Sequence, residues 1–163
     1  MKIARMNHTN RLRACLGGES IDRPPVALWR HFPVDDQTAD GLAAAVLDFQ
    51  RAYDFDLVKV TPASSYCLKD WGVQDEWRGF SEGTRAYTRA VISSPEDWHK
   101  LPVLDPQKGY LGEHLDCLRR LVRELGPETP AIATIFSPLS QAKNLAGGER
   151  LLIHMRRFPD ALA

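Results

Sequence analysis

TADGLAAAVLDFQRAYDFDLVKVTP, residues 38–62, joins a helix to a strand and decides the class of the fold. Asp40 stands in the first turn, where the helix dipole favours a negative charge. The apolar residues then recur at helical spacing: Leu42, Val46, Phe49 and Tyr53. This pattern predicts a helix over Thr38 to Tyr53. The short apolar run Leu57–Thr61, stopped by Pro62, predicts a buried strand directly after it.

Two further apolar runs predict buried strands, one earlier in the sequence at Val26–Arg30 and one later at Ala131–Phe136. Neither alternates between apolar and polar residues, which is typical of strands covered on both faces of a parallel sheet. Helices are predicted from capping residues and spacing over the following segments: 7–16, 94–98, 111–125, 137–145 and 149–157, with a first turn at 159–161.

The segment between the second strand and the next long helix predicts a β-hairpin. Its arms are Asp75–Phe80 and Thr84–Ile92, and Gly83 lies in the turn. Buried strands that alternate with amphipathic helices indicate an α/β fold with a parallel sheet. Three strands do not close a barrel, which needs about eight strands and roughly 250 residues. The order of elements therefore predicts a small open domain or part of a larger one.

The composition excludes several classes of protein. The chain has 163 residues with 21 basic and 21 acidic side chains, so bulk charge favours neither nucleic acid nor a membrane surface. No apolar run approaches the roughly 20 residues of a membrane helix, and no secretory signal is recognisable. Cys15, Cys67 and Cys117 are far apart, so neither a disulfide framework nor a zinc finger is expected. The cytoplasm is the default compartment.

Three stretches carry a resemblance to a known family. They are Arg23-Pro24-Pro25-Val26 with Trp29-Arg30, Asp56–Pro62 with Asp70-Trp71-Gly72, and Phe136-Ser137-Pro138-Leu139 with Leu145-Ala146-Gly147. In this order they resemble the uroporphyrinogen decarboxylase superfamily. The resemblance covers essentially all of this chain and corresponds to about the first half of the length of a family member. The resemblance implies a partial (β/α)8 TIM-type barrel. Residues 1–163 would supply an N-terminal extension, about the first three βα units and the inserted hairpin.

The same resemblance implies two chemistries. The first is the family's namesake activity, cofactor-independent decarboxylation of a tetrapyrrole, as in porphyrin biosynthesis. The alternative is methyl transfer to or from a corrinoid or thiol with zinc, whose ligands would lie in the second half of the family's chain. The implied partner is an anionic small molecule, tetrapyrrole or corrinoid, and a homodimer stays open. A third alternative is a truncated, non-catalytic fragment that binds a partner over its open sheet edge. Whichever function holds, the chain alone is expected to be inactive and poorly soluble, because a partial barrel leaves strand edges unpaired.

The candidate site residues come from the carboxyl ends of the predicted strands, the functional end of such a barrel. They are expected to bind substrate: Arg30, His31, Thr61, Ser64, Tyr66 and Ser137. The family's catalytic aspartate would fall near Thr61 or Pro62, and neither is acidic, so no residue is assigned as catalytic. The family's substrate-contacting tyrosine aligns near Asn144, and its second arginine is replaced by Val34. His154 is expected at the surface, and Trp77, Tyr87 and Trp98 in a small satellite core.

Overall fold

The structure is a computed structural model that describes residues 4–162. The described chain divides into two compact units. The first contains the residues up to Pro62 together with His114–Thr134. The second contains Ala63–Glu113 and the residues from Ile135 onward. None of the helices in this described part is long and apolar enough to cross a membrane.

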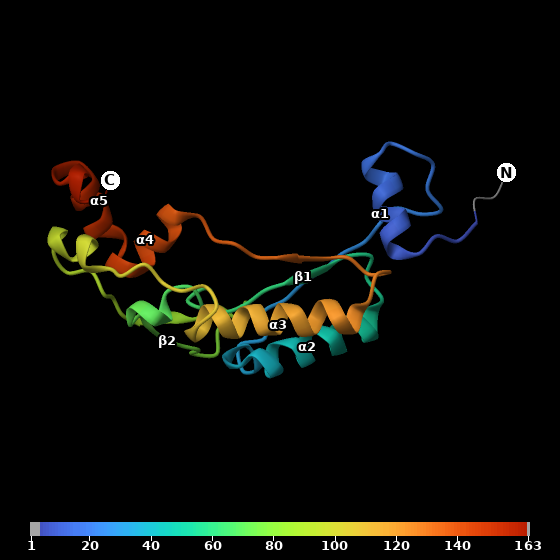
Figure 1. Cartoon of the computed structure of the whole chain (residues 1–163), viewed down its shortest axis with the longest axis horizontal. Helices are drawn as coiled ribbons and strands as arrows, with labels where there is room; N and C mark the ends of the chain where they lie inside the picture. The colour runs from blue at the N-terminus through green and yellow to red at the C-terminus, as the bar shows by residue number, and fades with distance from the viewer. Residues whose placement is uncertain (1–3, 163) are drawn as a thin grey trace. The chain divides into compact units, whose positions relative to one another are not determined.

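The first unit is a two-stranded parallel sheet covered by helices. Strand β1, Val58–Val60, pairs with β4, Ala131–Ala133, so that Val58 lies opposite Ala131 and Val60 opposite Ala133. Helix α2, Ala39–Tyr53, begins where the Thr38 side chain accepts a hydrogen bond from the Gly41 amide. Helix α3, Gly109–Leu125, runs beside α2 along the sheet (Figure 1). The helix–strand order predicted around residues 38–62 is therefore confirmed.

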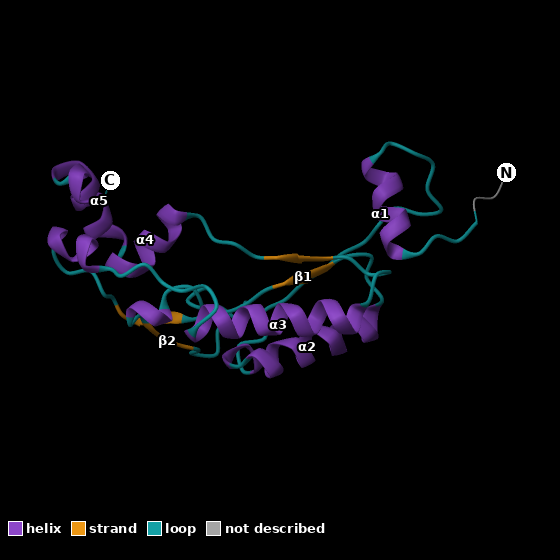
Figure 2. Ribbon diagram, in the orientation of Figure 1, coloured by secondary structure: helices purple, strands orange, loops and turns teal. Residues whose placement is uncertain are grey.

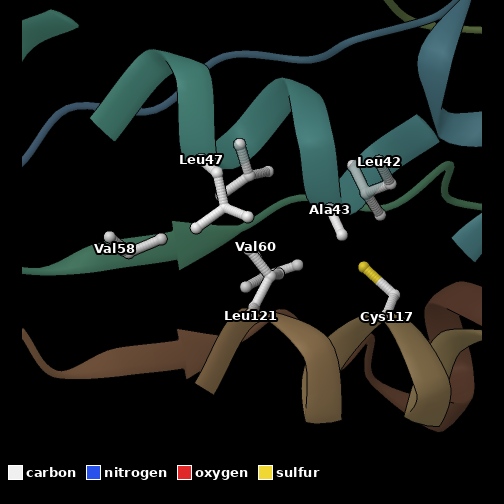
Figure 3. Close-up of a cluster of buried hydrophobic side chains, with 8 residues drawn as sticks. Leu42, Ala43, Leu47, Val58, Val60, Cys117 and Leu121 are labelled. Carbon is white, nitrogen blue, oxygen red and sulfur yellow. The ribbon is translucent and has the colours of Figure 1, made fainter. Parts of the chain in front are cut away.

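A compact apolar core joins these helices to β1. Val58 and Val60 alternate with Lys59, so both valines face the helices, as period-two geometry requires. Figure 3 shows them between side chains from α2 and α3, and the buried cluster comprises Leu42, Ala43, Val46, Leu47, Val58, Val60, Cys117 and Leu121. Cys117 is part of this packing, and burial raises the pKa of its thiol to about 12. It is therefore an inert core residue at neutral pH.

The predicted strand Val26–Arg30 is wrong, because the structure has no strand there. The two prolines before Val26 have no amide hydrogen to donate to a sheet. The Val26 amide instead donates to the Asp56 carboxylate at 2.7 Å, and the Val26 carbonyl accepts from the Asp56 amide at 2.8 Å. The carboxylate and the amide of Asp56 thus form the hydrogen bonds that a neighbouring strand would otherwise form with Val26.

The other prediction to correct is the burial of the third strand. It is shorter than expected, and Ile132 is 48% exposed, with Ile135 beyond it at 85%. In the parallel register Ile132 lies opposite Lys59, whose ammonium group is 4.0 Å from the centroid of the Trp29 ring. The helices α2 and α3 therefore cover one face of this sheet, and the opposite face leaves apolar side chains exposed.

The N-terminal helix α1, His8–Leu16, belongs to the first unit. Asn7 caps it by accepting from the Asn10 amide, and Gly17 ends it, as predicted. Thr9 anchors the helix to a distant part of the chain. Its amide donates to the carbonyl of Glu128 at 3.0 Å and its hydroxyl to that of Pro127 at 2.9 Å.

The second unit contains a short antiparallel pair in the region where the sequence predicts a hairpin. Strand β2, Gln74–Glu76, pairs with β3, Ala86–Arg89, with a register irregularity at Gln74/Asp75 (Figure 2). Gly83 adopts a φ of 71°, a conformation that suits glycine, and its amide donates to the Phe80 carbonyl. The strands are shorter than the predicted arms. Two 3-10 helices, Lys69–Trp71 and Pro95–Lys100, flank the pair.

Two helices and a final turn complete the second unit. Helix α4, Pro138–Ala146, and helix α5, Gly148–Arg157, begin and end close to the predicted positions, and a 3-10 turn follows at Pro159–Ala161. Their apolar faces share one buried cluster: Leu68, Val73, Ile92, Leu145, Ala146 and Leu151. The surface prediction for His154 is wrong, because this side chain is 4% exposed and its Nδ1 accepts a hydrogen bond from Trp98 Nε1 at 3.0 Å.

Candidate functional site

The six candidate residues are divided between the two units. Arg30, His31 and Thr61 lie in the first unit, and Ser64, Tyr66 and Ser137 lie in the second. The burial and the hydrogen-bond partners of each residue therefore decide which of its atoms can bind a ligand.

Arg30 and His31 lie on the connection that precedes α2. Arg30 is exposed, its Nε donates to the His31 carbonyl at 3.3 Å, and its guanidinium carbon is 5.3 Å from the Phe32 ring centroid. The hollow that Arg30 borders in the first unit has a volume of about 10 Å³, room for a water molecule and not for a substrate. Its exposed guanidinium remains a group that an anion can approach.

Thr61 follows β1 directly and is 4% exposed. Its Oγ1 is buried without a hydrogen-bond partner among the described residues. Pro62 beside it is also buried. The position where the resemblance places a catalytic aspartate is therefore a neutral, buried hydroxyl followed by a proline.

In the second unit three polar side chains form one hydrogen-bonded chain, called the Tyr87 network here. Ser64 Oγ lies 2.9 Å from the Tyr87 hydroxyl, and Asn144 Nδ2 donates to the same hydroxyl at 3.0 Å. Burial raises the pKa of Tyr87, opposed by the Ser64 hydrogen bond, so the phenol keeps its proton at neutral pH. Either hydroxyl can donate in the Ser64–Tyr87 bond, and since that bond uses one of the two hydroxyl protons, the other proton is available to a ligand.

Tyr66 and Ser137 lie at the beginning of α4. The Tyr66 ring is 6.3 Å, centroid to centroid, from the ring of Phe136. Burial, with a smaller contribution from Cys67, raises the pKa of Tyr66. Ser137 caps α4 by accepting from the Ser140 amide. The structure thus brings Tyr66 and Ser137 to the same end of α4, and it places Ser64 in the network with Asn144.

Supporting contacts hold the loop that carries Ser64. The buried Ser65 hydroxyl donates to the Asp75 carboxylate, which also lies 3.1 Å from Arg85 Nε and 3.7 Å from Lys69 Nζ. Cys67 on the same loop is a free thiol whose pKa is raised by burial, so it is not a thiolate at neutral pH. The loop therefore offers hydroxyl groups and no nucleophilic sulfur.

Sequence reasoning missed the densest charged group of the first unit, the Asp56 cluster of His8, Arg11, Asp22, Arg23 and Asp56. The Asp56 side chain is 1% exposed, and both of its oxygens accept hydrogen bonds from Arg11, Arg23, the Val26 amide and His8 Nδ1. Burial acts to raise the pKa of Asp56, but the bonds from Arg23, His8, Val26 and Arg11 outweigh it and hold the pKa well below the usual range. Its hydrogen-bonding capacity is used up within the protein, so the cluster is structural.

Sequence reasoning also missed Gln141 and the role of Tyr87. Gln141 lies on α4 and is 8% exposed, and neither atom of its amide has a hydrogen-bond partner among the described residues. The signal was present in the sequence, because Ser137, Gln141 and Asn144 repeat at the spacing of one helix face. Tyr87 was expected only as part of a satellite core.

The comparisons with known proteins agree with this architecture. The family model described as "Uroporphyrinogen decarboxylase (URO-D)" matches residues 7–163. The chain belongs to the uroporphyrinogen decarboxylase family. Among the curated proteins none matches the sequence.

A solved structure of a methyltransferase from Methanosarcina mazei is similar to the chain, with a TM-score of 0.74 at 16% sequence identity. The match covers 97% of this chain and 50% of that one, so the chain spans about half the length of the matched structure. At this identity the likeness establishes a shared α/β fold for this family member.

Proposed function

We propose that the chain is the substrate-binding N-terminal part of a (β/α)8 barrel enzyme whose reaction is methyl transfer involving a corrinoid or a thiol. The observation that carries the proposal is the chemistry of the candidate groups. Thr61 and the Tyr87 network offer neutral hydroxyl and amide groups. Such groups hold and orient a substrate, but they do not include the anion that would stand beside protonated pyrrole nitrogens.

A methyltransferase structure shares this fold, so the fold accommodates the proposed reaction. Zinc, when bound in such enzymes, converts a thiol to a thiolate nucleophile. Among residues 4–162 no group of three or more His, Cys, Asp and Glu side chains could hold a metal ion. The described residues therefore do not fit a zinc site, and the part that we propose for them is binding and orientation.

Decarboxylation of a tetrapyrrole is the second candidate, and two observations favour it. The family model that matches carries that activity in its description, and Arg30 presents an exposed guanidinium that a substrate carboxylate could reach. Both functions involve a macrocyclic ligand, a corrinoid or a tetrapyrrole. Because the two rings carry different peripheral groups, one binding experiment separates the two functions.

The test is titration of the protein with dicyanocobinamide, whose periphery carries carboxamides, and with uroporphyrin III, whose periphery carries carboxylates. Visible absorbance and tryptophan fluorescence follow the two titrations. Tighter binding of the corrinoid supports the proposal, and tighter binding of the porphyrin replaces it with decarboxylation. If neither ligand binds below millimolar concentration, both functions are ruled out for this chain. The variant Thr88→Ala, next to Tyr87 but exposed, is the control for unspecific effects.

A further inference from the structure

Gln141 is the polar side chain of the second unit whose burial the fold leaves unexplained. It is more than nine-tenths buried, and both Oε1 and Nε2 lack a hydrogen-bond partner among the described residues. Buried polar groups are nearly always hydrogen-bonded, and an exception calls for a specific reason. A primary amide with both atoms unsatisfied requires a partner that donates and accepts at the same time.

The position of Gln141 on α4 indicates which groups surround it. In an α-helix, residues four and seven positions apart share a face, so Gln141 lies between Ser137 and Asn144. The Asn144 end of this face is joined to Tyr87 and Ser64 by hydrogen bonds. At the other end, Tyr66 packs against Phe136, next to the capping residue Ser137. The opposite side of the helix carries the exposed Lys143.

We infer that this face of α4 binds a carboxamide group of the ligand, through both atoms of the Gln141 amide and the hydroxyl of Ser64. A carboxamide has an N–H donor for Gln141 Oε1 and a carbonyl acceptor for Gln141 Nε2. A carboxylate has acceptors only and would leave Oε1 unsatisfied. The groups placed along the face, Ser64, Tyr66, Tyr87, Asn144 and Gln141, are uncharged at neutral pH, so none of them balances the charge of a buried carboxylate.

This inference rests on the proposed function, because it names the part of a corrinoid that the chain recognises. It also gives a reason for selectivity. A site that is built to hydrogen-bond a polar group rejects an analogue that leaves its own polar atoms unpaired. The Gln141 face therefore selects a ring with peripheral carboxamides against a ring with peripheral carboxylates.

The first experiment measures binding of dicyanocobinamide to the wild-type chain, to Gln141→Leu and to the control Lys143→Gln on the exposed side of the same helix. We expect Gln141→Leu to weaken binding about tenfold, the usual effect of losing one to two neutral hydrogen bonds. The same variant should unfold at an equal or higher urea concentration than the wild type, because it removes unsatisfied polar atoms. The control should leave both quantities unchanged. Wild-type affinity in Gln141→Leu overturns the inference while the proposed function stands.

A second experiment tests the inference whether or not a corrinoid binds. The Gln141 side-chain amide signals are identified in a ¹H–¹⁵N spectrum as those absent from Gln141→Leu, and the protein is titrated with acetamide and, separately, with acetate. We expect acetamide to shift these signals and acetate at the same concentration to leave them in place. Signals that respond to neither probe, or to both equally, mean that solvent alone satisfies Gln141, and the inference is then wrong. Failure of the corrinoid titration with a positive acetamide response removes the proposed function and not the carboxamide site.

Discussion

The Asp56 cluster of the first unit and the Tyr87 network of the second are both groups of hydrogen-bonded polar side chains, but they differ in how completely their hydrogen-bonding atoms are satisfied. Each oxygen of Asp56 accepts from arginine, and an amide and an imidazole complete the set. In the network, the Ser64–Tyr87 bond uses one of the two hydroxyl protons and leaves the other, and Gln141 nearby on α4 has neither amide atom bonded among the described residues. A saturated charged cluster holds parts of the chain together, whereas unsaturated neutral groups retain capacity for a ligand. The number of satisfied hydrogen bonds, and not polarity, distinguishes the structural Asp56 cluster from the proposed binding site.

The largest expected effect is on stability in the first unit. Asp56→Ala should lower the free energy of unfolding by about 3–5 kcal/mol, because it removes the buried carboxylate that Arg11 and Arg23 share and leaves Arg11, which is 2% exposed, with Asp22 as its remaining carboxylate partner. Urea denaturation followed by circular dichroism measures the change. The matched control is Asp48→Ala on helix α2, whose side chain is 74% exposed and pairs with the exposed Arg51, and which should cost less than about 1 kcal/mol. Equal losses in the two variants would mean that the cluster does not act as the anchor of this unit.

The second expected effect is on the dependence of stability on pH. Hydrogen bonds from Arg11 and from the Met6 amide hold the pKa of Asp22 below its usual range, and Asp56 is depressed by its own partners. A carboxylate with a depressed pKa stabilises the fold above its unfolded value of about 3.9, and this stability is lost as the pH falls from there through the folded pKa.

The free energy of unfolding should therefore fall steeply below about pH 4, and it should fall less steeply in Asp56→Asn, which has one fewer proton to take up. Urea titrations at a series of pH values give the two slopes. Parallel slopes in the wild type and in Asp56→Asn would contradict the assignment of acid sensitivity to this carboxylate.

The smallest effect is expected in the network. Tyr87→Phe removes the hydroxyl that joins Ser64 to Asn144, and it should cost about 1–3 kcal/mol, because two partners lose a hydrogen bond. Denaturation measures this cost, and the corrinoid titration should weaken as well, since Ser64 and Asn144 lose their orientation. Tyr53→Phe, at a side chain that is 63% exposed, is the control. If Tyr87→Phe loses stability but binds the corrinoid with wild-type affinity, the Tyr87 network is purely structural, like the Asp56 cluster.

The difference between the two regions also explains which features the sequence predicts. Helix α2 follows from periodicity, since Leu42 and Val46 are buried where the spacing places them. Helix α3 lies over the predicted segment, but Leu121 is buried there, whereas Val122 of the predicted apolar stripe is 61% exposed. The capping of α4 by Ser137 follows from local chemistry. Such features depend on residues close together in the chain, so the sequence displays them directly.

Features that depend on distant residues were not predicted. Asp56 satisfies groups from residue 8 to residue 26, and it replaces the strand partner that Val26 would need. His154 is buried because Trp98, from another element, donates a hydrogen bond to it. For the candidate site, the sequence predicts Ser64, Tyr66 and Ser137 as substrate contacts, but the hydrogen bonds that join Ser64 to Asn144 come from the packing of β3 and α4 and are not displayed by the sequence.

The anchoring of α1 by Thr9 has a consequence for the synthesis of the chain. The hydroxyl of Thr9 and the carbonyl of Pro127 are separated by 118 positions. At about 5–20 residues per second, a ribosome needs on the order of ten seconds to make the intervening segment. During that interval the first helix has been translated but lacks this attachment, so until the end of α3 emerges it depends on its ion pairs with Asp22 and Asp56.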